Sequence, residues 1–271
     1  MNSAHAAQAR RFHGLHHAGL LVLPNAWDAG TAKLIESIGA QAIATTSAAV
    51  AWSHGYADGN HLPVPVLAAT VAEITRVIRV PLSVDLEGGY SSDPAVVGEN
   101  VATVIGAGAV GINLEDAADS PDLLCAKIEQ ARRAASRLGV ELFVNARIDT
   151  YLRATIPPER RLEETLARAA YYRTAGADGI FVPGLIEAAA IRTIAASVGL
   201  PLNVLARTGL PAAAELVHLG VRRLSAGSGI PEVMYGRTAG LAADFLRDGV
   251  SAPLADGAMP YRDINTLMAA R

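Results

Sequence analysis

The chain has 271 residues, of which 51% are hydrophobic and 18% charged, and its formal net charge is −3. These values favour one large packed domain over residues 1–271 and exclude a disordered or strongly basic chain. The sequence contains one cysteine and no apolar run of membrane-spanning length. We therefore expect a cytoplasmic protein that acts on a small molecule and has neither a nucleic acid nor a membrane as a partner.

Eight short runs rich in Val, Ile and Leu recur along the chain, and Ala-rich helical stretches follow them. This alternation is typical of βα units around a parallel sheet, and eight such units close a barrel. The sequence therefore predicts the α/β class, as a (β/α)8 TIM barrel. The predicted strands are 21–25, 42–46, 82–87, 110–115, 142–147, 179–183, 202–205 and 223–226.

Two segments depart from the regular pattern. About 40 residues separate the starts of the second and third strands, far more than a short βα loop needs, and the stretch 47–65 contains His54 and Asp58. It leaves the sheet at the C-terminal face, where barrel enzymes keep their chemistry, so we interpret it as an active-site loop with His54 as a candidate acid or base. The segment 230–271 predicts extra C-terminal helices, available to pack on a partner subunit.

Three other features have both a structural and a chemical interpretation. The histidines near the N-terminus, at positions 5, 13, 16 and 17, predict a polar, solvated helix rather than a metal cluster. The turn 225–229 after the last strand is either a phosphate cradle at a helix start or a tight turn. Cys125 lies in an apolar, helix-starting context, which favours a buried structural thiol.

Polar side chains gather on one side of several predicted strands. Because alternate strand residues face the same way, Asp85 and Glu87 share a side, and Glu115 faces the barrel mouth in the next strand. We expect the ring to be completed by Asn25, Thr46, Ser47, Arg147, Asn203 and Ser225.

Such a ring of carboxylates requires a counter-ion. Two unit charges ~6 Å apart repel by roughly 3 kcal/mol at an effective dielectric constant of ~20. Arg147 can neutralise one charge, but several hard oxygen ligands with few His or Cys residues nearby favour Mg²⁺, with Mn²⁺ as the alternative. We therefore predict a metal site formed by Asp85, Glu87 and Glu115. The structural alternative is that these acids form salt bridges alone.

Several motifs occur together near the ends of the predicted strands. They are Pro-Asn-Ala-Trp-Asp-Ala-Gly at 24–30, Thr-Thr-Ser at 45–47 with Trp52 and Gly-Tyr at 55–56, Val-Asp-Leu-Glu-Gly-Gly-Tyr at 84–90, Gly-Ile-Asn-Leu-Glu-Asp at 111–116, and Asn-Ala-Arg-Ile-Asp at 145–149. Over most of its length the chain resembles the isocitrate lyase / phosphoenolpyruvate mutase superfamily.

The resemblance implies a Mg²⁺-dependent barrel that acts on small α-oxo or α-hydroxy carboxylates through a pyruvate-type enolate. It implies a homodimer or homotetramer in which the last helix is swapped between subunits. By position, Asp85 matches the main metal ligand, while Asp58, Glu87 and Glu115 match acids that hold the waters of the metal. Arg147 matches a substrate-binding arginine. The strand-two turn at Thr46, Ser47 and Ala48 matches the grip on the substrate carboxylate, and Asn203 is a further substrate-binding candidate.

Two departures from the family pattern bear on the reaction. Many members have Asp-x-Asp where this chain has Asp85-Leu86-Glu87, and the gating motif Lys-(Lys/Arg)-Cys-Gly-His of the lyases is absent after Glu115. We expect a lyase that makes or breaks a C–C bond, with P–C mutase or hydrolase chemistry as other possibilities. The alternatives are a non-catalytic barrel that keeps the metal and carboxylate pocket, and a phosphate-binding barrel enzyme that uses the turn 225–229.

Overall fold

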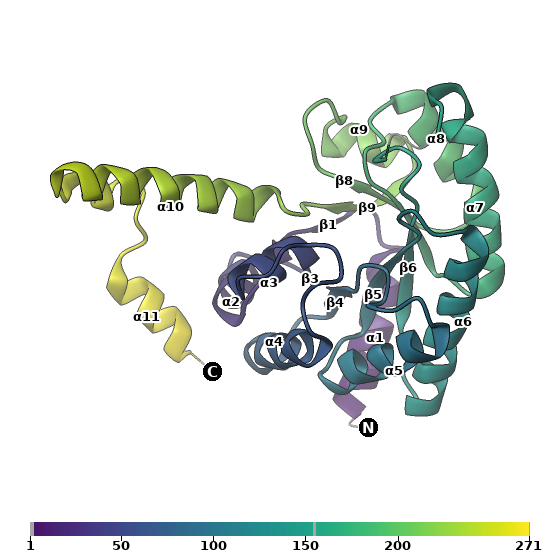
Figure 1. The fold of residues 1–271 in the computed structure, drawn as a ribbon, viewed down its shortest axis with the longest axis horizontal. Coiled ribbons are helices and arrows are strands. Elements are labelled where there is room, and N and C mark those ends of the chain that lie inside the picture. The colour runs from purple at the N-terminus through teal and green to yellow at the C-terminus, as the bar shows by residue number, and fades with distance from the viewer. Residues whose placement is uncertain (1–2, 154–155, 271) are drawn as a thin grey trace.

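The computed structural model describes residues 3–153 and 156–270, and parallel strands form its centre (Figure 1). The sheet order is β1-β9-β8-β7-β6-β5-β4-β3-β2, and every pair in it is parallel. The strands are β1 (Leu21–Leu23), β2 (Asn25–Ala26), β3 (Ile43–Thr45), β4 (Leu82–Asp85), β5 (Gly111–Glu115), β6 (Phe143–Arg147), β7 (Gly179–Val182), β8 (Leu202–Leu205) and β9 (Val221–Ser225).

The predicted barrel is confirmed, but its first strand is divided in two. Pro24 separates β1 from β2, because proline has no N–H to donate to a sheet ladder. β1 pairs with β9, whereas β2 pairs with β3. β1 and β2 together thus link β9 to β3 and close the ring.

Helices connect the strands and cover the outside of the ring (Figure 1). Proline in the first turn begins α4, α5 and α6, while Gly139 and Gly176 end α6 and α7 in the left-handed conformation. The covering helices are α2 (Ala29–Ser37), α3 (Ser47–Ser53), α4 (Val64–Val77), α5 (Pro94–Gly106), α6 (Pro121–Leu138), α7 (Arg161–Ala175), α8 (Ala188–Ser197) and α9 (Ala213–His218), with a 3-10 turn η1 (Pro158–Arg160) before α7.

The predicted active-site loop 47–65 is shorter than expected. Its first part is the helix α3, which ends at Ser53, and its last residues begin α4 at Val64. Five consecutive residues of α3, Ser47 to Ala51, are buried. Only the segment between the two helices is therefore a loop.

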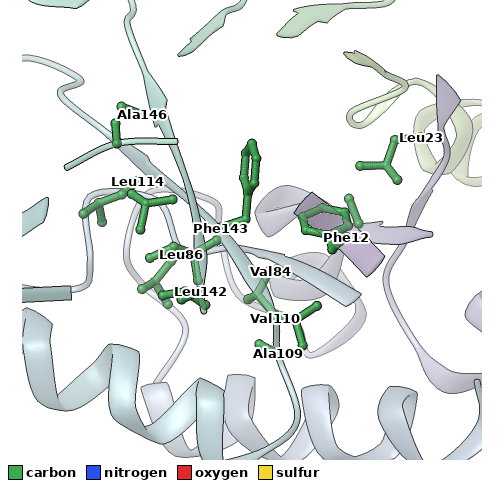
Figure 2. Packing of buried hydrophobic residues seen from close by; sticks show 14 of the residues in the cluster. Phe12, Leu23, Val84, Leu86, Ala109, Val110, Leu114, Leu142, Phe143 and Ala146 are labelled. Carbon is green, nitrogen blue, oxygen red and sulfur yellow. The ribbon is translucent and has the colours of Figure 1, made fainter. Parts of the chain in front are cut away.

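The N-terminal helix α1 (Ser3–Leu15) packs against the N-terminal ends of the strands, so the prediction of a solvated helix is wrong. Phe12 is fully buried, and its ring makes an edge contact with Phe143 at 5.5 Å between centroids (Figure 2). His16, just after α1, is also buried and stacks on Phe143 at 3.9 Å. A Cβ at Gly111 would lie 2.5 Å from the Phe12 ring, so this glycine makes room for the N-terminal segment 3–17, here called the plug.

The C-terminal segment forms helices, as predicted. The helix α10 (Gly229–Asp248) projects away from the barrel, and the chain then passes through the 3-10 turn η2 (Ala252–Ala255) to α11 (Tyr261–Ala269) (Figure 1). α11 returns to α2, where Lys33 Nζ donates to the Met268 carbonyl at 3.2 Å. None of the helices in residues 3–153 and 156–270 combines the length and the apolar character needed to cross a membrane.

Candidate active site

Asp85 ends β4 and is held by three neighbouring elements. Its backbone N–H donates to Thr45 Oγ1 at 2.8 Å, and its Oδ2 accepts from the Ser47 N–H at the start of α3 at 3.2 Å. Its Oδ1 accepts from Asn113 Nδ2 at 3.4 Å. The carboxylate is therefore oriented at the C-terminal end of the barrel by backbone and amide donors, without an ion-pair partner among the described residues.

Glu87 lies two residues beyond, in a backbone conformation that favours glycine, with φ 49°. Its Oε1 accepts from the Tyr90 hydroxyl at 2.8 Å, and its Oε2 accepts from the backbone N–H of Asn60. Asn60 also accepts from the Tyr90 N–H at 3.0 Å. Glu87 thereby fastens the loop before α4 to the segment after β4.

Glu115 and Arg147 end the neighbouring strands β5 and β6, where they are register partners. Arg147 Nη1 lies 2.5 Å from Glu115 Oε2. On its other side Arg147 makes a bidentate contact with Asp149, with Nε donating at 2.7 Å and Nη2 at 3.0 Å. Arg153 donates to the same Asp149 at 3.0 Å. The guanidinium is thus fixed in one orientation between two carboxylates.

Burial and mutual charge shift the pKa values of this cluster. Burial raises the pKa of Glu115 to about 8, against the opposing charge of Arg147 and with the help of Asp85. Burial likewise raises the pKa of Glu87, and the charges of Asp58 and Asp85 add to the effect. Burial lowers the pKa of Arg147, but Glu115 and Asp149 outweigh it and the pKa is raised overall. An added cation would favour the ionised form of both glutamates.

A second polar layer lies below the mouth. Asn113 Oδ1 accepts from Asn145 Nδ2 at 2.9 Å and from Arg223 Nη2 at 3.4 Å. Arg223 is 1% exposed, donates to Ser225 Oγ at 3.2 Å, and leaves its Nη1 without a partner. Burial lowers its pKa to about 9, while Asp85 opposes the shift. Sequence reasoning missed this arginine, although its alternation with Ser225 on β9 placed it on the inner side.

The predicted strand-two turn follows β3 and begins α3. Thr46, Ser47 and Ala48 are buried at the start of α3, with Thr46 as the N-cap. The Ser47 N–H points to Asp85. Asp58 lies in the exposed segment before Asn60, near enough to Glu87 to raise its pKa. The structure therefore brings this turn, Asp58 and the carboxylates together.

Two predicted residues lie elsewhere. His54 caps the end of α3, and its Nε2 is 2.9 Å from Thr70 Oγ1 of α4. It lines a surface pocket together with Trp27 rather than the carboxylate cluster. Asn203 is buried inside the barrel beside Arg223, its register partner, and its Oδ1 accepts from Ser225 Oγ at 3.1 Å. Neither residue contacts Asp85, Glu87 or Glu115.

The segment after β5 occupies the position of the missing gating motif. Asp116 is fully buried and accepts from Arg168 Nη1 and the Tyr172 hydroxyl, both at 2.8 Å. Buried Lys127 donates to the Gly88 carbonyl at 2.8 Å and to Asp119 at 3.2 Å, which ties this segment to the one after β4. Cys125 is partly buried within α6, with its pKa raised by burial.

The turn after β9 is engaged within the protein. The Gly227 N–H donates to Asn25 Oδ1 at 2.7 Å, and Ser228 Oγ donates to Glu232 Oε1 at 2.6 Å. Asn25 also donates to the Thr45 carbonyl at 2.7 Å. These bonds favour the tight-turn interpretation over the phosphate cradle.

The oxygen donors of this site suit a small, hard divalent metal. Within residues 3–153 and 156–270, no three His, Cys, Asp or Glu side chains form a ready-made ligand group. Mg²⁺ commonly retains several waters and takes one or two protein carboxylates, so an oriented Asp85 flanked by Glu87 and Glu115 fits it. The fit rests on hard oxygen donors and on the raised pKa of both glutamates.

The chain is similar to one protein-family model and to several known proteins. The family model described as phosphoenolpyruvate phosphomutase matches residues 12–246. An uncharacterized protein of Mycobacterium tuberculosis (strain ATCC 25618 / H37Rv) is 36% identical over 93% of this chain and 94% of its own. A crystal structure of a candidate lyase/mutase from Burkholderia cenocepacia J2315 superposes with a TM-score of 0.90 at 34% identity, covering 99% of this chain and 98% of the other. The oxaloacetate decarboxylase of Paraburkholderia xenovorans (strain LB400) is 30% identical over 74% of this chain and 69% of its own.

Proposed function

Since the chain belongs to the phosphoenolpyruvate phosphomutase family, within the isocitrate lyase / phosphoenolpyruvate mutase superfamily, we propose that it is a Mg²⁺-dependent lyase. Its substrate is a small α-oxo or α-hydroxy carboxylate, in which it makes or breaks a C–C bond through a pyruvate-type enolate. The observation that carries the proposal is the fixed guanidinium of Arg147 between Glu115 and Asp149, in the same cluster as Asp85.

Each group has a distinct part in this proposal. Asp85 would hold Mg²⁺, or Mn²⁺ in its place, with the carboxylates of Glu87 and Glu115 beside it. When bound, the cation would supply Lewis-acid stabilisation of negative charge on the substrate oxygen. Arg147 binds the substrate and spreads its charge, while the N–H groups and hydroxyls at Thr46, Ser47 and Ala48 hold its carboxylate.

The segment after β5 limits the range of reactions. Lys127 holds it through Asp119, and it lacks the cysteine that serves the lyases as an acid or base. The name of the P. xenovorans relative describes the loss of a carboxyl group from oxaloacetate. A reaction of that kind needs only solvent to protonate the enolate, so it suits a site without a gating acid.

The second candidate function is a non-catalytic barrel that binds a metal and a carboxylate. The missing gating acid favours it. Such a protein would retain Asp85 and Arg147 and bind the same anions without turning them over.

The test combines binding with turnover. Oxalate mimics a pyruvate enolate, so we expect isothermal titration calorimetry to show oxalate binding that requires Mg²⁺ and is lost in Asp85→Ala. Asp28→Asn is the matched control, because Asp28 lies at the same end of the barrel but caps α2. Turnover is measured with oxaloacetate, phosphonopyruvate and a panel of 2-hydroxy di- and tricarboxylates. Binding without turnover of any of these favours the second candidate, and failure to bind oxalate with Mg²⁺ contradicts both.

We also propose that the protein is a homodimer or homotetramer in which α10 packs on another subunit. Pro231 is the only described residue of this 20-residue helix that is buried, and the exposed side chains include Phe245 at 47% and Leu246 at 86%. Light scattering after size exclusion should give a multiple of 28.1 kDa. The double change Phe245→Glu and Leu246→Glu should yield monomers, and a monomeric wild type would contradict the assignment.

A further inference from the structure

A second concave site lies at the opposite end of the barrel from the carboxylates. This hollow, here called the basal pocket, has a volume of about 450 Å³. It is lined by the end of the plug at His17, by α8 at Arg192, by the end of α9 at His218 and by β9 at Arg222. Its volume falls in the range of small-molecule sites.

The fold opens this pocket by shortening one helix. α9 has six residues, whereas its neighbour α8 has ten. Two left-handed glycines form turns beside it, Gly199 with φ +66° and Gly220 with φ +89°. A Cβ at Gly220 would lie 3.1 Å from the Cβ of Ala195, so the turn after α9 packs directly against α8. The pocket is therefore framed by backbone rather than by flexible side chains alone.

The charge of the basal pocket is of one sign. Among the described residues that line it, Arg192 and Arg222 carry a positive charge, His17 and His218 lie beside them, and none is acidic. Arg192 and Arg222 form no ion pair or side-chain hydrogen bond with another described residue. Two guanidinium groups with free donors thus share one hollow.

The ends of α8 and α9 contribute only part of a counter-charge. A helix C-terminus carries about half an elementary negative charge, which is less than that of one guanidinium. At the end of α8 the Val198 carbonyl already accepts from Arg173 Nη1 at 3.2 Å, which adds a further cation beside the pocket. The excess of positive charge therefore remains.

We propose that the basal pocket binds a small anion that carries two or more negative charges, presented as a phosphate group or as carboxylates. Arg192 and Arg222 each donate to it through their planar forks, and His17 and His218 border the bound group. The pocket is distinct from the proposed active site, which is acidic and lies at the other end of the strands.

The test uses the metal-free full-length protein at constant ionic strength. Inorganic phosphate and succinate are titrated separately by calorimetry into the wild type, Arg192→Gln, Arg222→Gln and Arg10→Gln. The last variant removes the same charge from α1 at the same end, outside the pocket. We expect each pocket variant to bind about tenfold more weakly, because a charge-assisted hydrogen bond is lost, and Arg10→Gln to bind as the wild type does.

Each outcome decides the proposal. Binding of phosphate alone or of succinate alone supports it and identifies the chemical group of the ligand. The proposal is overturned if the folded wild type binds neither anion at ~100 mM. That concentration is about 100-fold above ~1 mM, the upper end of the usual range of Michaelis constants. Equal weakening in all three variants also overturns it, since that result indicates a diffuse surface charge.

Discussion

The two ends of the barrel differ in the source of their polar groups. At the C-terminal end, Asp85, Glu115 and Arg147 belong to consecutive strands and are held by contacts with neighbouring strands and with the start of α3. At the N-terminal end, the strands meet the apolar face of α1, and the basic groups come from α8, the end of α9, the outer side of β9 and the segment after α1. The strands therefore position the charged groups at one end, while the other end combines a stabilising plug with a peripheral basic pocket.

The largest expected effect on stability is at the plug. Phe12→Ala removes a fully buried ring and should lower the free energy of unfolding by about 3–5 kcal/mol, measured by urea denaturation. Arg11→Ala, on the exposed side of the same helix, should change it by less than about 0.5 kcal/mol. Mg²⁺-dependent oxalate binding by the folded Phe12 variant should be unchanged. A loss of that binding would contradict the separation of the two ends.

At the other end, Arg147→Lys should affect activity more than stability. A lysine cannot make the bidentate contact with Asp149 and the contact with Glu115 together, so we expect turnover to fall by about 10²–10³-fold. Arg153→Lys is the control, because Arg153 reaches the same Asp149 from a position that is 45% exposed. Retention of turnover within about threefold in Arg147→Lys would contradict the role of the fork.

His16 makes the plug sensitive to acid. Burial and then the charge of Arg223 lower its pKa from 6.5 to about 3, so the ring is neutral in the folded protein. The unfolded chain takes up the proton first as the pH falls below 6.5. The stabilisation is therefore complete above that pH and is lost progressively between pH 6.5 and 3.

We expect His16 to account for a loss of about 2–3 kcal/mol of unfolding free energy between pH 7.5 and 4.5. Urea denaturation across this range should show a smaller loss in His16→Gln, which keeps a hydrogen-bond donor near the Phe12 carbonyl. His13→Gln, three residues earlier in α1, is the control. Parallel pH profiles for the wild type and His16→Gln would contradict the assignment.

Period-two alternation explains why much of the mouth could be predicted. Asp85, Glu115 and Arg147 lie on strands, and a strand's local pattern determines which side each residue faces. The contacts of Glu87 with Asn60 and Tyr90 depend on the path of two loops, which no local pattern specifies.

The same reasoning explains the errors. His54 lies in the predicted loop, yet the helix α3 extends to Ser53 and turns it toward Thr70. The positions of α1 that face the barrel could not be recognised from its polar composition. Only Ala9 and Phe12 of its described residues are buried, and two arginines directly separate them. A local pattern indicates which residues share a face, whereas tertiary packing decides what that face meets.

The smallest expected effect is at Asp28, which we interpret as a structural acid and not as one of the acids of the site. Asp28 lies at the C-terminal end of the barrel within one of the family motifs, but its Oδ1 accepts from the Thr31 N–H at 2.7 Å and from Thr31 Oγ1 at 2.9 Å. This is a capping box for α2. Asp28→Ala should therefore lower the free energy of unfolding by about 1 kcal/mol and leave Mg²⁺-dependent oxalate binding intact. Asp28→Asn should restore most of the stability, because asparagine also accepts at an N-cap. If Asp28→Ala instead abolished oxalate binding, the acids of this end could not be divided into helix caps and site residues by their hydrogen bonds.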